Sequence, residues 1–80
     1  MNVHGFEITE EQQSACIDAM VGTFRAANIT AAAIKAGVPE IIKTRWGGRE
    51  YHAMRVADRL IQKMRKVGMI QREGKEWRRT

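Results

Sequence analysis

The chain has 80 residues, of which 44% are hydrophobic and 29% are charged. This length predicts a single domain over residues 1–80, and the apolar content suffices for a compact core, which excludes global disorder. The net charge of +5 is distributed unevenly: residues 1–34 contain one arginine and four acids, whereas residues 49–80 contain ten Lys and Arg and four acids. This asymmetry indicates an acidic partner, with nucleic acid the first candidate.

The cysteine and histidine content excludes several other classes of protein. A single cysteine, Cys16, cannot form an intramolecular disulfide, and two scattered histidines add no spacing typical of a zinc site. The first twelve residues lack the basic start and apolar run of a signal peptide, and no segment has the apolar length of a membrane span. We therefore expect a cytoplasmic protein without a metal, a cofactor or a membrane contact.

The first predicted helix covers about residues 10–26. Thr9 is placed to cap it, and Gln12 stands three residues later, where a capping-box partner reaches back. Apolar residues then recur at helical spacing from Ile17 to Phe24. Cys16 lies beside this stripe, so we expect it to pack in the core rather than act as a nucleophile.

A second, shorter helix is predicted over about residues 31–36, with Thr30 as its cap and Gly37 at its end. The stretch from Glu40 to Glu50 is ambiguous. It favours a short helix through Arg45, with a loop held by Trp46 as the alternative, and Gly47-Gly48 ends either one. Trp46 and Tyr51 are both expected to pack.

The strongest helical pattern lies in a long helix over about residues 49–67. At about 100° per residue, the apolar residues fall within an arc of roughly 140° and the mainly basic ones within roughly 100°, nearly opposite. The apolar set is Met54, Ala57, Leu60, Ile61, Met64 and Val67. The polar set is His52, Arg55, Arg59, Gln62, Lys63 and Lys66.

The C-terminal residues, about 69–79, predict a hairpin of two short strands around a turn at Glu73-Gly74. Ile70 and Trp77 are expected to share its inner face. The basic side chains are expected outside or at the tip: Arg72, Lys75 and Arg78.

The order of these elements resembles the winged helix-turn-helix family. Residues 28–38 are similar to the first helix of a helix-turn-helix with its preceding strand, and residues 57–72 to a recognition helix that leads into a wing. The resemblance implies a mainly α fold with a small β-hairpin, a winged helix of three or four helices plus a C-terminal two-stranded wing. It also implies that the partner is double-stranded DNA. Residues 40–50 make the connection between these two segments longer than is usual in the family.

The charge pattern and the resemblance together predict the DNA-binding residues. Arg55 and Arg59 are the candidates for base contacts, because arginine can form two hydrogen bonds to guanine. The other cations are expected at phosphates, which position a protein on DNA without specifying a sequence. The predicted set is Arg45, Arg49, His52, Arg55, Arg59, Lys63, Arg72, Lys75, Arg78 and Arg79.

These features predict a DNA-binding protein, a small transcriptional regulator of phage or bacterial type. One alternative is a protein-interaction module with an acidic partner, because a fold does not fix a function. Another is a phage DNA-packaging protein, since residues 28–38 also resemble the helix-turn-helix of terminase small subunits. No carboxylate pair, nucleophile–base set or phosphate-binding loop predicts an enzyme. A homodimer is left open.

Overall fold

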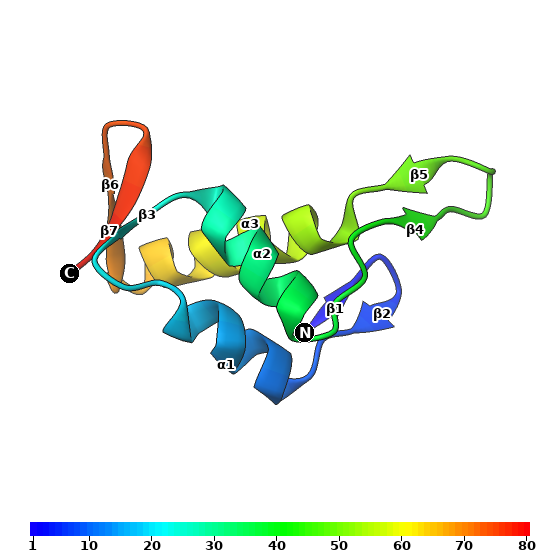
Figure 1. Ribbon diagram of the computed structural model, residues 1–80, viewed down its shortest axis with the longest axis horizontal. Helices are drawn as coiled ribbons and strands as arrows, with labels where there is room; N and C mark the ends of the chain where they lie inside the picture. Colours follow the sequence, from blue (N-terminus) through cyan, green and yellow to red (C-terminus); the bar gives the residue numbers. More distant parts are fainter.

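The computed structural model describes all residues, 1–80. Three helices pack together, and seven short strands form three separate sheets around them (Figure 1). The helices are α1 (Glu10–Asp18), α2 (Ala26–Lys35) and α3 (His52–Lys66). None of them combines the length and the apolar content that crossing a lipid bilayer requires.

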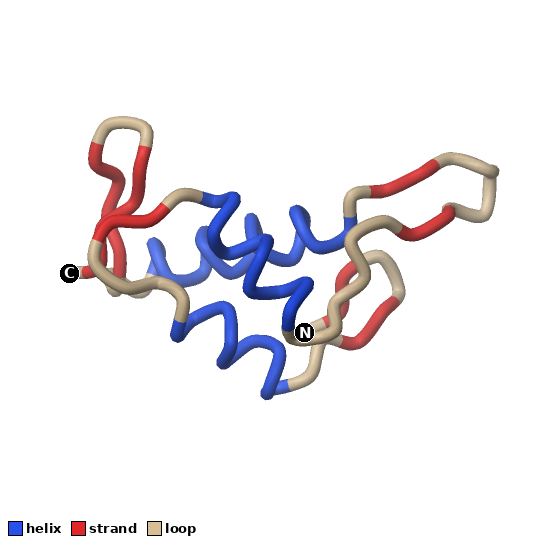
Figure 2. The backbone as a smooth tube through the Cα atoms, in the orientation of Figure 1, coloured by secondary structure: helices blue, strands red, loops and turns tan.

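The three sheets lie at different places on the helices (Figure 2). The N-terminal hairpin joins β1 (Asn2–Val3) to β2 (Phe6–Glu7), and the middle hairpin joins β4 (Ile42–Lys43) to β5 (Arg49–Glu50). The third sheet has the order β3-β7-β6, with β3 at Thr23–Phe24, β6 at Ile70–Glu73 and β7 at Glu76–Arg79.

The expected fold class, mainly α with a two-stranded C-terminal wing, is wrong. Seven strands accompany the three helices, and the structure is a mixture of α and β. The C-terminal hairpin gains a third strand because Phe24 pairs with Trp77 and Thr23 with Arg78. Two further hairpins, at the N-terminus and in the middle of the chain, were not expected at all.

Helix α1 begins as predicted but ends earlier. The Thr9 hydroxyl accepts a hydrogen bond from Gln12 N at 3.1 Å, and the Gln12 side chain accepts one from Thr9 N at 3.0 Å. The helix stops at Asp18 instead of continuing to about residue 26, because the chain must be extended at Phe24 to pair with β7. Cys16 is fully buried, as expected.

Helix α2 begins at Ala26, five residues before the expected start. Thr30 therefore lies inside the helix, where its hydroxyl donates to Ala26 O at 3.1 Å instead of capping. The Asn28 side chain accepts a hydrogen bond from Arg25 N at 2.9 Å and so fixes the first turn. The sequence prediction missed this start because it assigned residues 28–30 to an extended segment.

The region from Glu40 to Arg45 is not the favoured short helix. Ile42 pairs with Glu50 and Lys43 with Arg49, which forms the middle hairpin. Trp46 lies at its tip and is 91% exposed, and Tyr51 is 60% exposed, so the expectation that both side chains pack is also wrong. The two glycines after Trp46 do mark a turn, but this turn joins the two strands of a hairpin instead of ending a helix.

The buried face of α3 differs from the predicted one on both sides. Met54 and Val67 are 57% and 63% exposed, whereas His52, Ala53 and Val56 are fully buried. The shift arises because β1 and β2 cover the His52 side of the helix. The buried residues of α3 are His52, Ala53, Val56, Ala57, Leu60, Ile61 and Met64.

The connection from α3 to the C-terminal hairpin has a specific conformation. Gly68 has φ +80°, a region that strains residues with a Cβ, and Met69 N donates to Met64 O at 3.0 Å across it. Ile70 and Trp77 are both buried, in agreement with the expected inner face. The turn comprises Gly74-Lys75, one residue later than expected, so Arg72 stands opposite Trp77.

Candidate nucleic-acid interface

The middle hairpin carries three cations that no acidic side chain neutralises. Lys43, Arg45 and Arg49 are exposed, and none of them forms a salt bridge with a carboxylate. Arg45 and Arg49 are thus placed as a phosphate-binding role requires. Lys43 was absent from the predicted set, although its position beside Arg49 on the paired strand gives it the same access.

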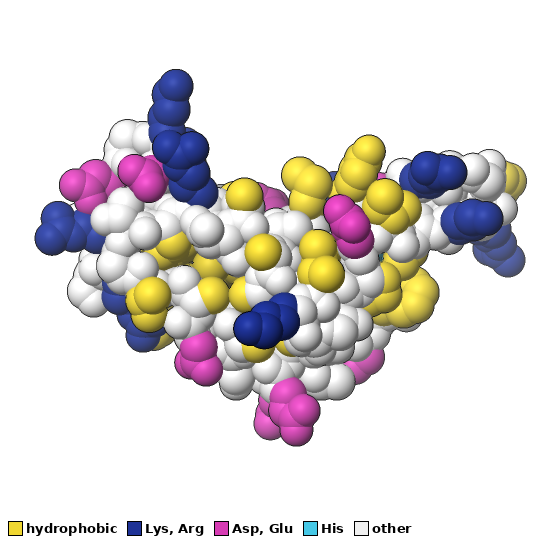
Figure 3. Space-filling model, viewed as in Figure 1, with side chains coloured by type: hydrophobic (Ala, Val, Ile, Leu, Met, Phe, Trp, Pro, Cys, Tyr) yellow, Lys and Arg dark blue, Asp and Glu magenta, His cyan; other side chains and the backbone are white.

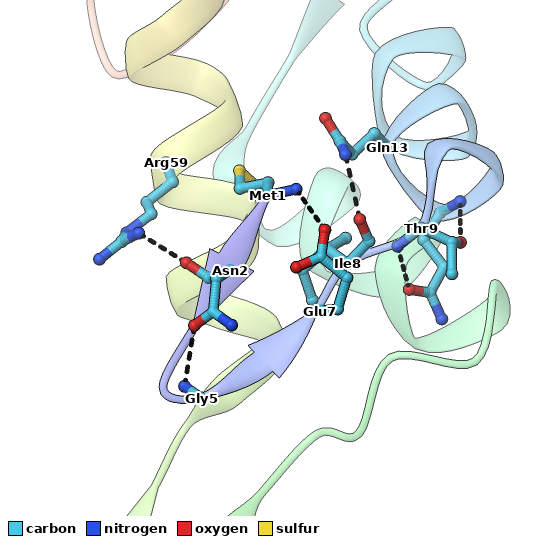
Figure 4. Close-up of polar contacts among 9 residues, drawn as sticks. Met1, Asn2, Gly5, Glu7, Ile8, Thr9, Gln13 and Arg59 are labelled. Carbon is cyan, nitrogen blue, oxygen red and sulfur yellow. Dashed lines mark hydrogen bonds and ion pairs between the residues drawn. The ribbon is translucent and has the colours of Figure 1, made fainter.

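The predicted contact residues of helix α3 differ from one another in whether they are free to contact a partner. Arg55 is exposed and without an acidic partner. Arg59 instead donates from its guanidinium to Asn2 O at 2.9 Å and ties β1 to the helix (Figure 4). Lys63 is exposed without an acidic partner. Of the two candidates for base contacts, only Arg55 keeps its full donor set available.

His52 does not reach the surface at all, although it was predicted to contact DNA. Its ring lies 5.3 Å from that of Phe6 and 5.8 Å from that of His4, measured between ring centroids. Neither ring nitrogen has a hydrogen-bond partner. Burial lowers the pKa of His52, and the neighbouring His4 lowers it further. The side chain is therefore a neutral core residue under the N-terminal hairpin.

The buried imidazole predicts that acid weakens the fold. A lowered folded-state pKa means that the unfolded chain binds the proton more readily, so stability falls as the pH drops below the ordinary histidine value of about 6.5. The loss approaches about 1.4 kcal/mol per pH unit until the pH reaches the folded-state pKa. We expect the melting temperature of His52→Leu to depend less on pH than that of wild type between about pH 5 and pH 7. Parallel pH profiles of wild type and variant would contradict this prediction.

The C-terminal hairpin uses most of its arginines to hold the fold. The Arg72 guanidinium lies 5.2 Å from the centroid of the Trp77 ring, so Arg72 is exposed as expected but covers the face of the hairpin that carries Trp77. Arg79 donates to Met20 O at 3.1 Å, and Arg78 lies 3.7 Å from the Glu73 carboxylate. Lys75 stands in the turn without an acidic partner.

The middle and C-terminal hairpins extend from opposite ends of α3 and flank a hollowed surface (Figure 3). We call this the two-hairpin surface. Lys and Arg side chains project at both of its ends; acidic side chains lie beside the C-terminal hairpin, between the hairpins and over α1 on the opposite edge. We assign to the two-hairpin surface five exposed cations without acidic partners, by the elements that carry them: Lys43, Arg45 and Arg49 of the middle hairpin, Arg55 of α3 and Lys75 of the C-terminal turn.

A groove of about 570 Å³ lies between the start of α2 and the first half of α3. Arg55 and Asp58 line it together with the exposed side chains of Tyr51 and Met54. Asp58 places a negative charge among the cations and therefore opposes an anionic ligand. The lining of the groove is accordingly mixed, with both apolar and charged side chains.

Trp46 is a candidate contact residue that the sequence interpretation took for a core residue. It was expected to pack, yet it is the most exposed large apolar side chain. The pattern Thr44-Arg45-Trp46-Gly47-Gly48-Arg49 contained the relevant signal: a tryptophan between arginines next to a glycine turn. Such a residue has no apolar neighbour in sequence to pack against.

Comparison of the chain with protein-family models, with curated proteins and with solved structures gave no match.

Proposed function

We propose that the protein binds double-stranded DNA through the two-hairpin surface. The observation that carries this proposal is that Lys and Arg side chains project from both ends of one hollowed surface, and that the middle hairpin and the C-terminal turn carry cations without acidic partners. A duplex presents one negative charge per about 1.7 Å of its axis, so such cations gain affinity by releasing condensed counterions. The resemblance of residues 28–38 and 57–72 to the winged helix-turn-helix family is part of the same proposal.

The dimensions of the molecule suit this partner. Its longest extent is 39 Å, and one turn of B-form DNA spans about 34–36 Å. Helix α3 has 15 residues, which at about 1.5 Å per residue separates the two hairpins by roughly 22 Å or more. The hairpins can therefore contact phosphates on both sides of a groove while α3 lies between them.

Within this arrangement Arg55 is the residue for base contacts. It is exposed on the first half of α3, where it lines the groove, and its guanidinium can donate two hydrogen bonds to guanine. Lys43, Arg45, Arg49 and Lys75 act on phosphates and position the protein. A small regulator of transcription in the cytoplasm is the role that we propose. The buried thiol of Cys16, unpaired in the fold, is compatible with a reducing compartment.

The test is titration of the protein against a labelled random-sequence duplex at several salt concentrations from about 50 to 200 mM. We expect the logarithm of the binding constant to fall linearly with the logarithm of salt. The four phosphate contacts of Lys43, Arg45, Arg49 and Lys75 set the slope at about −3.6, because each contributes about −0.9. Absence of binding at the lowest salt, or a slope near zero, would refute DNA binding.

Asp58→Asn is a variant that should strengthen duplex binding in this titration, whereas removal of a cation should weaken it. The substitution removes the negative charge from the groove lining with little change in shape, so we expect tighter binding at every salt concentration. Because no cation is added or lost, the slope should stay the same. Weaker binding of Asp58→Asn would mean that DNA does not approach the groove.

A protein partner is the second candidate, and the groove favours it. Tyr51 and Met54 are 60% and 57% exposed there, and aromatic and methionine side chains are enriched in protein interfaces. An acidic partner would use the same cations as DNA. Failure of the duplex titration, with retention of an acidic protein in a pull-down that Met54→Ala abolishes, would favour this function.

A further inference from the structure

The tip of the middle hairpin has a defined conformation rather than a loose one. Thr44 N donates to Gly48 O at 2.8 Å, Gly48 N to the Thr44 hydroxyl at 3.0 Å, and Gly47 N to Thr44 O at 3.1 Å. Gly47 has φ +81°, and a Cβ at position 48 would lie only 3.2 Å from the Thr44 hydroxyl. Gly47 is thus favoured by its backbone conformation and Gly48 by the close Thr44 side chain, in a closed loop that holds Trp46 at its apex.

The surroundings of Trp46 select an anionic partner. The indole is 91% exposed, and Arg45 and Arg49 flank it in the sequence of the hairpin. No acidic residue lies between Ile41 and Arg49, and Lys43 adds a third cation. Burial of an exposed tryptophan against a partner removes a large apolar surface from water. A polyanion with stackable faces provides both kinds of contact at once.

We propose that Trp46 is a wedge that inserts between base pairs of the duplex, while Arg45 and Arg49 hold the phosphates on either side. The proposal rests on the proposed DNA binding and adds a contact that the cations alone do not supply. Apolar wedges of this kind partly unstack a base step and kink the duplex. Stacking of a base on an aromatic side chain contributes about 1–3 kcal/mol, which is roughly 5- to 150-fold in affinity.

The pre-formed loop makes this insertion favourable. Because Thr44 and Gly48 already close the tip by hydrogen bonds, little conformational entropy is lost when the indole is fixed between bases. Trp77, the second tryptophan, is 7% exposed and cannot take this role. The two tryptophans are therefore separable by experiment, one on the surface and one in the core.

The test compares wild type, Trp46→Ala and Trp46→Phe in the duplex titration, with Val21→Ala as control. Val21 is another exposed apolar residue, 64% exposed in the α1–β3 connection. We expect Trp46→Ala to weaken binding about tenfold or more at every salt concentration with an unchanged salt slope, because it removes no charge. Trp46→Phe should keep most of the affinity, and Val21→Ala all of it.

Tryptophan fluorescence in the same titration reports insertion directly. Stacking on bases should quench the emission of wild type, and this component should be absent from Trp46→Phe, in which Trp77 alone emits. Wild-type binding with a normal salt slope, but with Trp46→Ala equally tight and no quenching, overturns the wedge and leaves DNA binding standing. No duplex binding by wild type overturns both, and a blue-shifted emission with anionic lipid vesicles would then assign the tip to a membrane surface.

Discussion

Replacing Arg45 and Arg49 together with alanine is expected to reduce the salt slope of duplex binding by about 2 and the affinity at low salt by roughly tenfold or more. Each removed phosphate contact lowers the slope by about one. Both residues are exposed and have no acidic partner, so their charge is available to DNA in the free protein. The measurement is the duplex titration from about 50 to 200 mM salt, with both proteins checked for the same melting temperature.

A control variant with the same change in net charge distinguishes a contact made by the middle hairpin from the general effect of a lower net charge. Lys35 and Lys66 are exposed cations at the ends of α2 and α3, outside the middle hairpin, and Lys35→Ala/Lys66→Ala also removes two positive charges. We expect this variant to change the slope much less than the hairpin variant does. Equal losses in the two variants would contradict a defined contact by the middle hairpin and leave only non-specific attraction.

Trp77→Ala is expected to destabilise the fold by about 3–5 kcal/mol, the range for truncating a buried large aromatic side chain. Trp77 is 7% exposed on the central strand of the three-stranded sheet, between Phe24 of β3 and Arg72 of β6. Its removal leaves a cavity and also takes the ring from beneath the Arg72 guanidinium. Domains of this size are marginally stable, so a large part of the protein should unfold at room temperature.

Urea denaturation of Trp77→Ala measures this loss, and Trp46→Ala is its matched control. The same side chain is truncated in both variants, but Trp46 is 91% exposed, so its change should stay within about 0.5 kcal/mol. If the two variants were destabilised equally, Trp46 would have to be packed in solution. The wedge would then lose its basis, whatever the result of the binding experiments.

The features that the sequence predicted well are those that depend on neighbouring residues. The capping box joins Thr9 to Gln12 within one turn of helix. The C-terminal hairpin pairs residues across a two-residue turn, and the apolar pair Ile70 and Trp77 identifies its inner face without knowledge of the rest of the chain. Local spacing is sufficient in both cases, because the interacting groups are close along the chain.

The errors have a common cause, which is contact between residues far apart in sequence. Strand β3 has only two residues and exists because Phe24 pairs with Trp77, more than fifty positions later. The same pairing ended the first helix early and moved the start of α2. The apolar arc of α3 was misplaced because the N-terminal hairpin, with no pattern of its own, covers His52 and engages Arg59.

The sequence by itself determined the positive C-terminal part, the long amphipathic helix and the hairpin after it, because charge and periodicity are properties of the linear chain. Only the tertiary structure decided which cations are available: Arg59, Arg72 and Arg79 hydrogen-bond to backbone carbonyls, whereas Arg45, Arg49 and Arg55 have no acidic partner. It also decided that Trp46 lies outside and His52 inside. Burial depends on what the rest of the chain places over a side chain, and periodicity within one element does not contain that information.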